Sequence, residues 1–125
     1  MNSRITRLHT ILKKNRLDGI VVSHQSNIAY LTEFPSSDSY LLITSDKSYF
    51  ITDSRYYEQA RLALKGIDII LGGKSVFKTI ADLVLSSKIK CLGFEARNLD
   101  FAQYQQIKKF SRPTRLVPTH GLIEE

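Results

Sequence analysis

The feature that most constrains this chain is the alternation of helix-like and strand-like segments from one end to the other. Apolar residues three and four positions apart predict helices, and short apolar runs bounded by polar residues or glycine predict strands. An alternation of this kind is typical of a sheet whose strands are joined by crossing helices. The 125 residues are enough for one domain. We therefore predict a single α/β domain with a six-stranded mixed sheet and helices on both faces.

The expected elements follow the chain in order. Five helices are expected, at residues 3–16, 27–32 and 53–65, in a segment that opens at Ser75, and in a segment capped by Asp100 and Gln103. Six strands are expected, at residues 19–22, 40–44, 49–52, 67–71, 90–94 and 114–117, with Pro118 ending the last. The polar turn between 40–44 and 49–52 predicts a hairpin. The spacing of apolar residues assigns Ala63, Phe101 and Phe110 to inward helix faces.

The charge balance is basic, with 18 Lys and Arg against 12 Asp and Glu and a net charge of +6. Such a surplus favours an acidic partner, but the basic residues follow the solvent sides of two expected helices, and no nucleic-acid-binding motif is present. We therefore expect no nucleic-acid partner, and a nucleic-acid binder would lose affinity steeply with salt. No apolar run approaches the ~20 residues that cross a bilayer. The absence of a secretory signal pattern and of a cysteine partner for Cys91 predicts a cytoplasmic protein with no membrane association.

The sequence contains no self-contained set of catalytic residues. Its three histidines, His9, His24 and His120, are far apart and have no familiar metal-ligand spacing. The Gly-Lys-Ser at 73–75 is not a phosphate-binding loop, because Asp68 stands where that motif requires glycine. No nucleophile elbow is present. We expect neither a catalytic residue nor a metal ligand set in this chain.

One segment that could carry chemistry is Thr52-Asp53-Ser54-Arg55-Tyr56. It runs from the end of an expected strand into the first turn of a helix, which is a favoured ligand position in α/β folds. Asp53 suits a helix cap, but Arg55 opposes the helix dipole there. Such an arginine could hold a carboxylate through its planar fork of donors. The alternative is a structural ion pair with Asp53 or with Glu58.

A second segment covers residues 26–34. Asn27 is a plausible helix cap and Tyr30 a plausible core anchor, so we interpret this segment as structural. The polar loop that follows it, residues 34–39, is expected to be exposed and could approach the site of a partner.

Taken in order, these segments resemble the N-terminal domain of the creatinase/prolidase family, which includes Xaa-Pro aminopeptidases (aminopeptidase P) and Xaa-Pro dipeptidases. The resemblance rests on Leu-Asp-Gly-Ile-Val-Val at 17–22, Asn-Ile-Ala-Tyr-Leu-Thr at 27–32, Thr-Asp-Ser-Arg-Tyr-Tyr-Glu-Gln-Ala at 52–60 and Gly-Phe-Glu at 93–95. Glu33 departs from the family, which usually has glycine there, so the turn after it is expected to differ. The resemblance assigns residues 1–118 to this domain and 119–125 to the start of a linker to a C-terminal metallopeptidase domain.

The resemblance implies a parent metallopeptidase that hydrolyses the Xaa-Pro bond of short peptides. Two divalent metal ions, commonly manganese, would be held in the C-terminal domain by two Asp, one His and two Glu, so this chain alone is expected to be inactive and to hold no cofactor. The N-terminal domain would help to form a homodimer and narrow access to the partner subunit's site. By its motif, Arg55 is expected to lie near the substrate in trans, with Phe34 and Asp38 beside it. The motif residues Asn27, Tyr30, Asp53 and Tyr56 are expected to be structural.

A different class of function stays open beside this one. The chain could be a free-standing α/β binding or interaction module without peptidase activity. The mass of the natural polypeptide distinguishes the two, because a peptidase subunit must be far heavier than 14.3 kDa. The resemblance leaves open whether the parent is of the aminopeptidase or the dipeptidase type.

Overall fold

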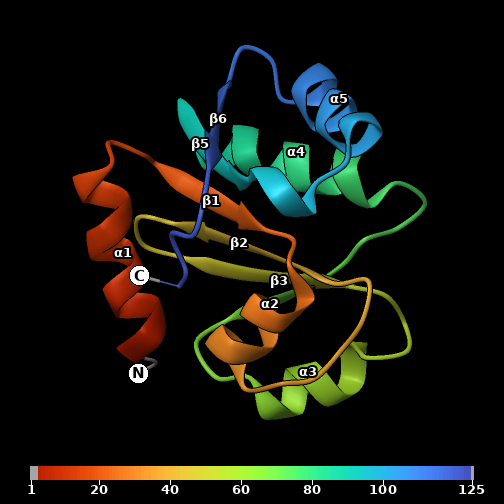
Figure 1. Cartoon of the computed structure of the whole chain (residues 1–125). Coiled ribbons are helices and arrows are strands. Elements are labelled where there is room, and N and C mark those ends of the chain that lie inside the picture. Colours follow the sequence, from red (N-terminus) through yellow and green to blue (C-terminus); the bar gives the residue numbers. More distant parts are fainter. Residues whose placement is uncertain (1–2, 125) are drawn as a thin grey trace.

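The computed structural model describes residues 3–124, which form one six-stranded mixed sheet with helices on both faces (Figure 1). The strands are β1 (Gly19–Val22), β2 (Tyr40–Thr44), β3 (Ser48–Thr52), β4 (Asp68–Leu71), β5 (Cys91–Glu95) and β6 (Arg115–Thr119). The helices are α1 (Ser3–Lys14), α2 (Gln25–Thr32), α3 (Tyr57–Ala63), α4 (Val76–Ser86) and α5 (Phe101–Phe110), with a short 3-10 turn η1 (Ala96–Asn98). The predicted fold class is confirmed.

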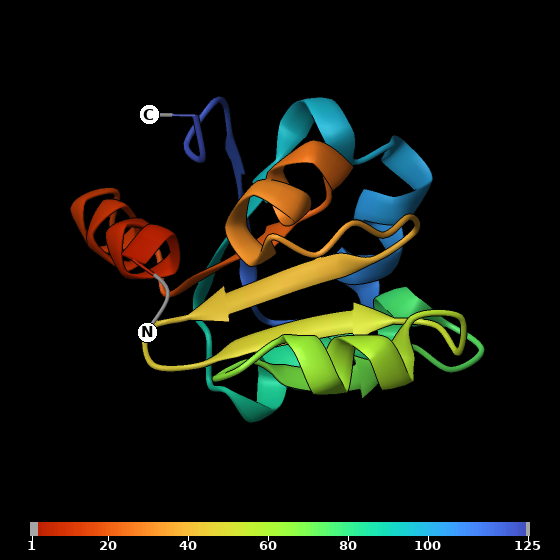
Figure 2. The same cartoon turned by 90° about the horizontal axis from the view of Figure 1, so that it is seen from below.

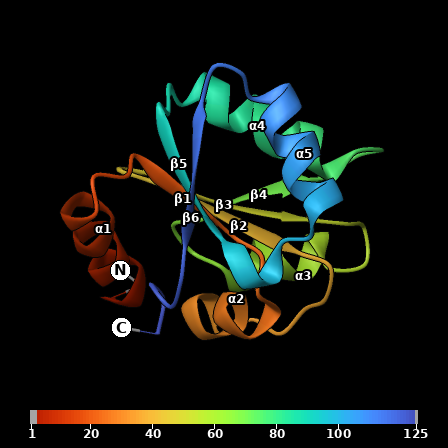
Figure 3. The ribbon, with the colours of Figure 1, turned by 45° about the horizontal axis from the view of Figure 1, so that its top comes forward.

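The strands lie in the order β4-β3-β2-β1-β5-β6. The predicted hairpin is the antiparallel pair β2–β3, and β1 is also antiparallel to β2. The pairs β1–β5, β5–β6 and β3–β4 are parallel, and helices make the crossovers between parallel strands. β4 therefore forms one edge of the sheet, beside β3, and β6 forms the other (Figure 3).

The sheet separates two apolar cores, because successive side chains of a strand point to opposite faces. Ile20 and Phe50 face α1, α2 and α3, whereas Val21 and Ile51 face α4 and α5. All four side chains are buried. Figure 1 shows α2 and α3 on one side of the sheet and α4 and α5 on the other, and Figure 2 shows the antiparallel arrows of β2 and β3 side by side. The short apolar run of β1 is thus covered on both faces, as its composition predicts.

Glycine is required in β1 for a reason of space. A Cβ atom at Gly19 would lie 2.9 Å from the Ile43 carbonyl oxygen and 3.0 Å from Ile89 Cδ1. The first of these contacts is with backbone, which cannot move aside without disturbing the β1–β2 pair. Gly19 therefore allows α4 and its following turn to close over the strand.

Several expected core positions are wrong. Tyr30 is 43% exposed and Phe101 is 73% exposed, and Ala63 is exposed as well. In α5 only Ile107 is buried, and Tyr104 packs partly buried against the same core. At about 100° per residue, Phe101 lies roughly 120° around the helix from Ile107, which turns it away from that core. Phe101 instead stacks on Tyr104, with the ring centroids 6.5 Å apart.

The prediction that Pro118 ends the last strand is also wrong, because Pro118 lies inside β6 opposite Phe94. A proline is tolerated in an edge strand where its nitrogen faces away from the neighbouring strand. The strand continues to Thr119, whose hydroxyl donates to the Phe94 carbonyl at 2.9 Å. After it, Leu122 and Ile123 are buried against the core that faces α1.

Candidate functional site

Three charged side chains meet beyond the end of β3. The Arg55 guanidinium donates from Nη2 to Asp53 Oδ2 at 2.7 Å and to Asp38 Oδ2 at 3.3 Å. Its Nε lies 3.1 Å from both carboxylate oxygens of Asp53. The structure thus brings together Arg55 and Asp38, which lie 17 residues apart in the chain.

The role expected for Asp53 as a helix cap is wrong. α3 begins only at Tyr57, and its N-cap residue Tyr56 provides no side-chain cap. Asp53 Oδ1 instead accepts the Arg55 peptide N–H at 2.9 Å, so it closes a turn before the helix and pairs with the same residue's side chain. Of the two ion pairs considered from the sequence, the one with Asp53 is present. Glu58 pairs with Arg61 at 3.4 Å.

The electrostatics of this cluster follow from its geometry. The hydrogen bond from Arg55 holds the pKa of Asp53 below its usual range, and the same bond raises the pKa of Arg55. The side chains of Arg55, Asp53 and Asp38 are 54%, 42% and 82% exposed, so water and salt screen the pair and it contributes little to stability. A ligand could therefore reach the guanidinium from solvent.

Aromatic side chains pack next to this cluster of Arg55, Asp53 and Asp38. The Arg55 guanidinium lies over the Tyr56 ring, 5.1 Å from its centroid. Phe34 packs edge-on against Tyr56 and against Phe50, with ring centroids 6.4 and 5.8 Å apart. The Ser37 and Tyr56 hydroxyls lie 3.0 Å apart. Phe34 and Tyr56 thus fix the loop 33–39 against β3, and Phe34 acts here through packing.

The loop itself has a defined shape. Glu33 and Asp38 have φ values of 56° and 53°, the left-handed region that favours glycine. Glu33 is the C-cap of α2, and its N–H donates to the Ala29 carbonyl. At the far end, Gln25 Nε2 donates to the Ser39 carbonyl at 2.9 Å. The turn after α2 therefore keeps the backbone conformation that a glycine would adopt, with glutamate in its place.

A second cluster, which the sequence analysis missed as a site, lies at the start of α2. Glu95, buried at the end of β5, accepts the peptide N–H groups of Ser23 and His24 at 2.8 and 2.9 Å. Asn27 Nδ2 donates to Glu95 Oε2 at 2.6 Å and to Glu124 Oε1 at 2.7 Å. Asn27 is therefore inside the helix and is not its cap. The only sequence signal was the Gly-Phe-Glu that ends the strand.

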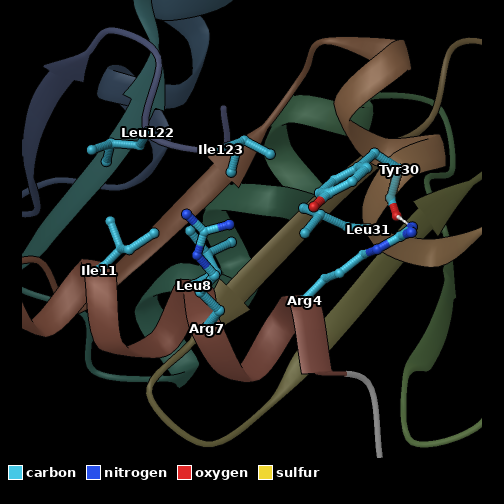
Figure 4. Close-up of a pocket in the computed structure, with 8 residues that line it drawn as sticks. All are labelled: Arg4, Arg7, Leu8, Ile11, Tyr30, Leu31, Leu122 and Ile123. Carbon is cyan, nitrogen blue, oxygen red and sulfur yellow. Dashed lines mark hydrogen bonds between the residues drawn. The ribbon is translucent and has the colours of Figure 1, made fainter. Parts of the chain in front are cut away.

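Tyr30 lies on a shallow groove between α1, α2 and the C-terminal turn (Figure 4). The Arg4 guanidinium lies 4.2 Å from the centroid of the Tyr30 ring and donates to the Tyr30 carbonyl. Leu122 and Ile123 lie across the groove from α1 in the same view. Tyr30 thus lines the groove and does not anchor the core, whereas its neighbour Leu31 is buried.

Neither cluster forms a metal centre. Among residues 3–124 no three His, Cys, Asp or Glu side chains are grouped so that they could hold a metal ion. Over the same residues, no helix is long and apolar enough to cross a membrane. What the Arg55 cluster can do chemically is bind a carboxylate or a carbonyl oxygen through guanidinium N–H groups.

Comparison with known proteins places these features in a family. The Creatinase/Prolidase N-terminal domain profile matches residues 4–125. An uncharacterized peptidase, YqhT, of Bacillus subtilis is 34% identical over 122 residues, which are 98% of this chain and 35% of that protein. The chain therefore spans about a third of the length of this curated relative.

Solved structures agree with the sequence match. The Xaa-Pro dipeptidase from Bacillus anthracis superposes with a TM-score of 0.90 at 30% identity, over 98% of this chain and 34% of that one. An Xaa-Pro aminopeptidase structure from Streptococcus pyogenes gives a TM-score of 0.90 at 31% identity, over 98% of this chain and 93% of that one. In the second structure a chain of about this size is thus a structural unit by itself.

Proposed function

Since this chain belongs to the creatinase/prolidase family as its N-terminal domain, we propose that it serves a metal-dependent peptidase that cleaves the Xaa-Pro bond of short peptides. The observation that carries the proposal is a collinear match over nearly the whole chain to peptidases about three times as long. The relatives include both an Xaa-Pro dipeptidase and an Xaa-Pro aminopeptidase, so the proposal covers both types.

In this proposal the present domain is non-catalytic and works in the cytoplasm. The catalytic groups and two divalent metal ions, manganese in the first instance, belong to a C-terminal domain that follows in cis. When bound there, the metals would supply an activated water and polarise the scissile carbonyl. The Arg55 cluster contains two carboxylates, Asp53 and Asp38, and the second cluster contains Glu95 and Glu124, so neither has the donor set of such a centre.

The domain's own contribution is to form the homodimer and to shape the site of the partner subunit. Arg55 suits this second task because its guanidinium is exposed and held in place by Asp53. Its Nη1 makes no hydrogen bond to any residue from 3 to 124, so that nitrogen is free to donate to a peptide carboxylate or carbonyl across the dimer. Asp38 and Phe34 belong to the loop 33–39, which lies beside Arg55.

The test begins with the natural polypeptide. Intact mass measured from the source cells should be well above 14.3 kDa, and that product should hydrolyse Xaa-Pro peptides when manganese is added. The same product should leave matched peptides without proline intact. A natural product of 14.3 kDa would exclude the peptidase and leave the interaction module, and a longer product without Xaa-Pro hydrolysis would exclude the activity.

A further inference from the structure

Three helices of this fold end at one edge of the sheet. β1, β5 and β6 are parallel neighbours, and they are preceded along the chain by α1, α4 and α5, respectively. The carboxyl ends of these helices and the turns that follow them therefore lie beside the amino ends of the three strands (Figure 3). Hydrogen bonds join the turns: the Arg115 N–H donates to the Lys90 carbonyl at 2.8 Å, and the Lys90 N–H donates to Asp18 Oδ2 at 3.1 Å.

The surface that these turns form is strongly basic. Its cations, here called the basic edge, are Lys13, Lys14, Arg16, Lys88, Lys90, Lys108, Lys109, Arg112 and Arg115. All nine are exposed, and none forms a salt bridge with a residue from 3 to 124. In the segments 13–18, 88–90 and 108–115 the one acidic residue is Asp18. The basic edge thus holds half of the 18 Lys and Arg and the rest of the chain is slightly acidic, so the whole surplus of +6 lies here.

The other half of the same sheet edge is balanced. β2 is antiparallel to β1, so the turn from β2 to β3 lies at this edge, and α3 ends there before β4. These segments contribute Lys47 and Lys65 together with Asp46 and Asp68. Lys47 lies 3.9 Å from Asp68. The excess of positive charge is therefore confined to the amino ends of β1, β5 and β6.

The helix dipole explains less than half of the basic edge. Cations are favourable in the last turn of a helix, and four of the nine stand there: Lys13, Lys14, Lys108 and Lys109. The other five lie after the helices. Two of these, Arg16 and Lys88, have φ values of 60° and 57°, in the left-handed region that favours glycine. The turn after α3 does have a glycine in that region, Gly66 with a φ of 75°. The chain thus carries cations at two positions where glycine would be favoured.

The composition of the basic edge fits phosphate groups better than a protein surface. Protein interfaces are rich in aromatic residues and poor in lysine, whereas six of these nine cations are lysines. Lys108 Nζ lies 5.8 Å from the centroid of the Tyr104 ring, and Lys109 Nζ lies 5.5 Å from that of Phe110. Both rings are half-buried. The bases of a single strand would therefore find little to stack on, and a duplex, which presents its phosphates outward, fits better.

We propose that the basic edge binds the phosphate backbone of a double-stranded nucleic acid without regard to sequence. Considered helix by helix, these cations are solvated faces and no such partner is expected; gathered on one surface, they can displace the counterions of a duplex. The helices on the two faces of the sheet spread them over about 20 Å. A duplex of that length carries about a dozen phosphates.

This binding surface goes beyond the proposed peptidase function. The Arg55 cluster lies beyond the end of β3, and Glu95 lies at the end of β5. Both strands are parallel to β1, so these two clusters lie at the carboxyl edge of the sheet, opposite the basic edge. A nucleic acid on the basic edge would therefore leave both clusters uncovered.

The test is a titration of a labelled DNA duplex of about 20 base pairs with this chain, followed by fluorescence anisotropy. At about 50 mM salt the dissociation constant should be about 10 μM or lower. If four or five of the cations contact phosphates, the logarithm of the association constant should fall with the logarithm of salt concentration with a slope of about −4. The affinity should then drop about 100-fold or more between about 50 and about 200 mM salt. A duplex of unrelated sequence should bind equally well.

Two paired substitutions separate binding from stability. Lys90→Gln with Arg115→Gln should weaken binding about tenfold or more and reduce the salt slope by about 2. Arg16→Gly with Lys88→Gly should weaken binding to a similar degree, while the melting temperature rises because glycine suits both backbone conformations. A solely structural role for these cations would not weaken binding.

Lys47→Gln with Lys65→Gln is the matched control, because it removes the same charge from the balanced half of the edge and should leave binding within about twofold. No binding at about 50 mM salt, or an equal loss in this control, overturns the proposal. Equally tight binding to polyglutamate or to vesicles of phosphatidylcholine and phosphatidylserine also overturns it, and assigns the surface to an acidic protein or a membrane. No readout depends on hydrolysis, so a failure here leaves the proposed peptidase function untouched.

Discussion

Asn27 and Glu95 are 68 residues apart in the chain, and Asn27 Nδ2 donates to Glu95 Oε2 at 2.6 Å. The other carboxylate oxygen accepts the peptide N–H groups of Ser23 and His24. These groups lie just before α2, and His24, the N-cap residue, makes no side-chain cap hydrogen bond. One buried carboxylate from β5 therefore holds both the turn between β1 and α2 and the Asn27 side chain in the first turn of the helix.

Replacing this carboxylate should be costly. Glu95→Ala leaves two peptide N–H groups without an acceptor and removes one of the two acceptors of the Asn27 amide, so the free energy of unfolding should fall by about 2–4 kcal/mol. Urea denaturation with linear extrapolation measures the change. Glu124→Ala removes the other acceptor of Asn27, but Glu124 is exposed, and the loss there should stay below about 1 kcal/mol. A larger loss for Glu124→Ala than for Glu95→Ala would contradict this account.

The turn after α2 offers a stabilising substitution. Glu33 holds a φ of 56°, a conformation that costs a side chain with a Cβ roughly 1 kcal/mol. Glu33→Gly should therefore raise the free energy of unfolding by about 0.5–1 kcal/mol, even after the greater freedom of glycine in the unfolded chain. Glu33→Ala keeps the Cβ and should give no such gain. Thermal melts of the two variants side by side test the difference, and equal melting temperatures would refute it.

Two glycines of the sheet should respond differently to a methyl group. In Gly19→Ala the new Cβ meets the Ile43 carbonyl at 2.9 Å, and because backbone must shift, we expect a loss of about 1–3 kcal/mol. In Gly93→Ala the nearest atom, Leu17 Cδ1 at 2.9 Å, is the end of a flexible side chain. That variant should lose less. Denaturant midpoints, compared at equal m-values, measure both losses of stability. A larger loss for Gly93→Ala than for Gly19→Ala would show that the β1–β2 backbone adjusts more easily than the Leu17 side chain.

Local patterns were enough to predict the elements of this fold, because each depends on residues near one another in sequence. The alternation of apolar runs, the hairpin turn and the capping box of Asp100 with Gln103 all appear in the structure. The exposure of Tyr30 and Phe101 could not be found in this way. Periodicity identifies an apolar stripe, but it does not tell how far along a helix the neighbouring element reaches.

The candidate site was only partly predictable for the same reason. Arg55 stood out because a cation is unfavourable at the start of a helix, and Asp53 lies two residues away. The contact with Asp38 depends on how the loop 33–39 returns to β3, which no local pattern specifies. Glu95 escaped notice because its partners begin 68 residues away, and the sequence contains no spacing that links them.

The pH dependence of the Arg55–Asp53 pair has a defined sign. Arg55 holds the pKa of Asp53 below its ordinary value of about 3.9. A lowered pKa means that the pair stabilises the fold fully above that value and loses its effect as pH falls through the lower folded-state pKa. NMR titration of the Asp53 carboxyl should show the shift, and Arg55→Ala should return the pKa toward 3.9. Arg61→Ala should leave the pKa of Asp53 unchanged. If both variants changed this pKa equally, its shift would come from the net charge of the protein and not from the contact with Arg55.

The Arg55 cluster can be tested for substrate contact in the full-length parent enzyme. If the free Nη1 of Arg55 binds a peptide carboxylate or carbonyl across the dimer, Arg55→Ala should lower kcat/KM for an Xaa-Pro peptide about tenfold or more. Arg55→Lys keeps the charge but lacks the planar guanidinium, so its kcat/KM should lie between those of Arg55→Ala and the wild type. A kcat/KM for Arg55→Ala within about twofold of the wild-type value would exclude substrate contact.

Arg61→Ala is the matched control for that experiment, because Arg61 is similarly exposed on α3 and pairs with Glu58. It should leave kcat/KM unchanged. Asp38→Asn separates the two carboxylates that hold Arg55: it removes the longer contact, 3.3 Å, and keeps the bidentate contact with Asp53. With the competing charge gone, the guanidinium should bind an anionic substrate group more strongly, so KM should fall by about two- to fivefold with kcat little changed. A rise in KM would instead mean that Asp38 positions Arg55 for the substrate.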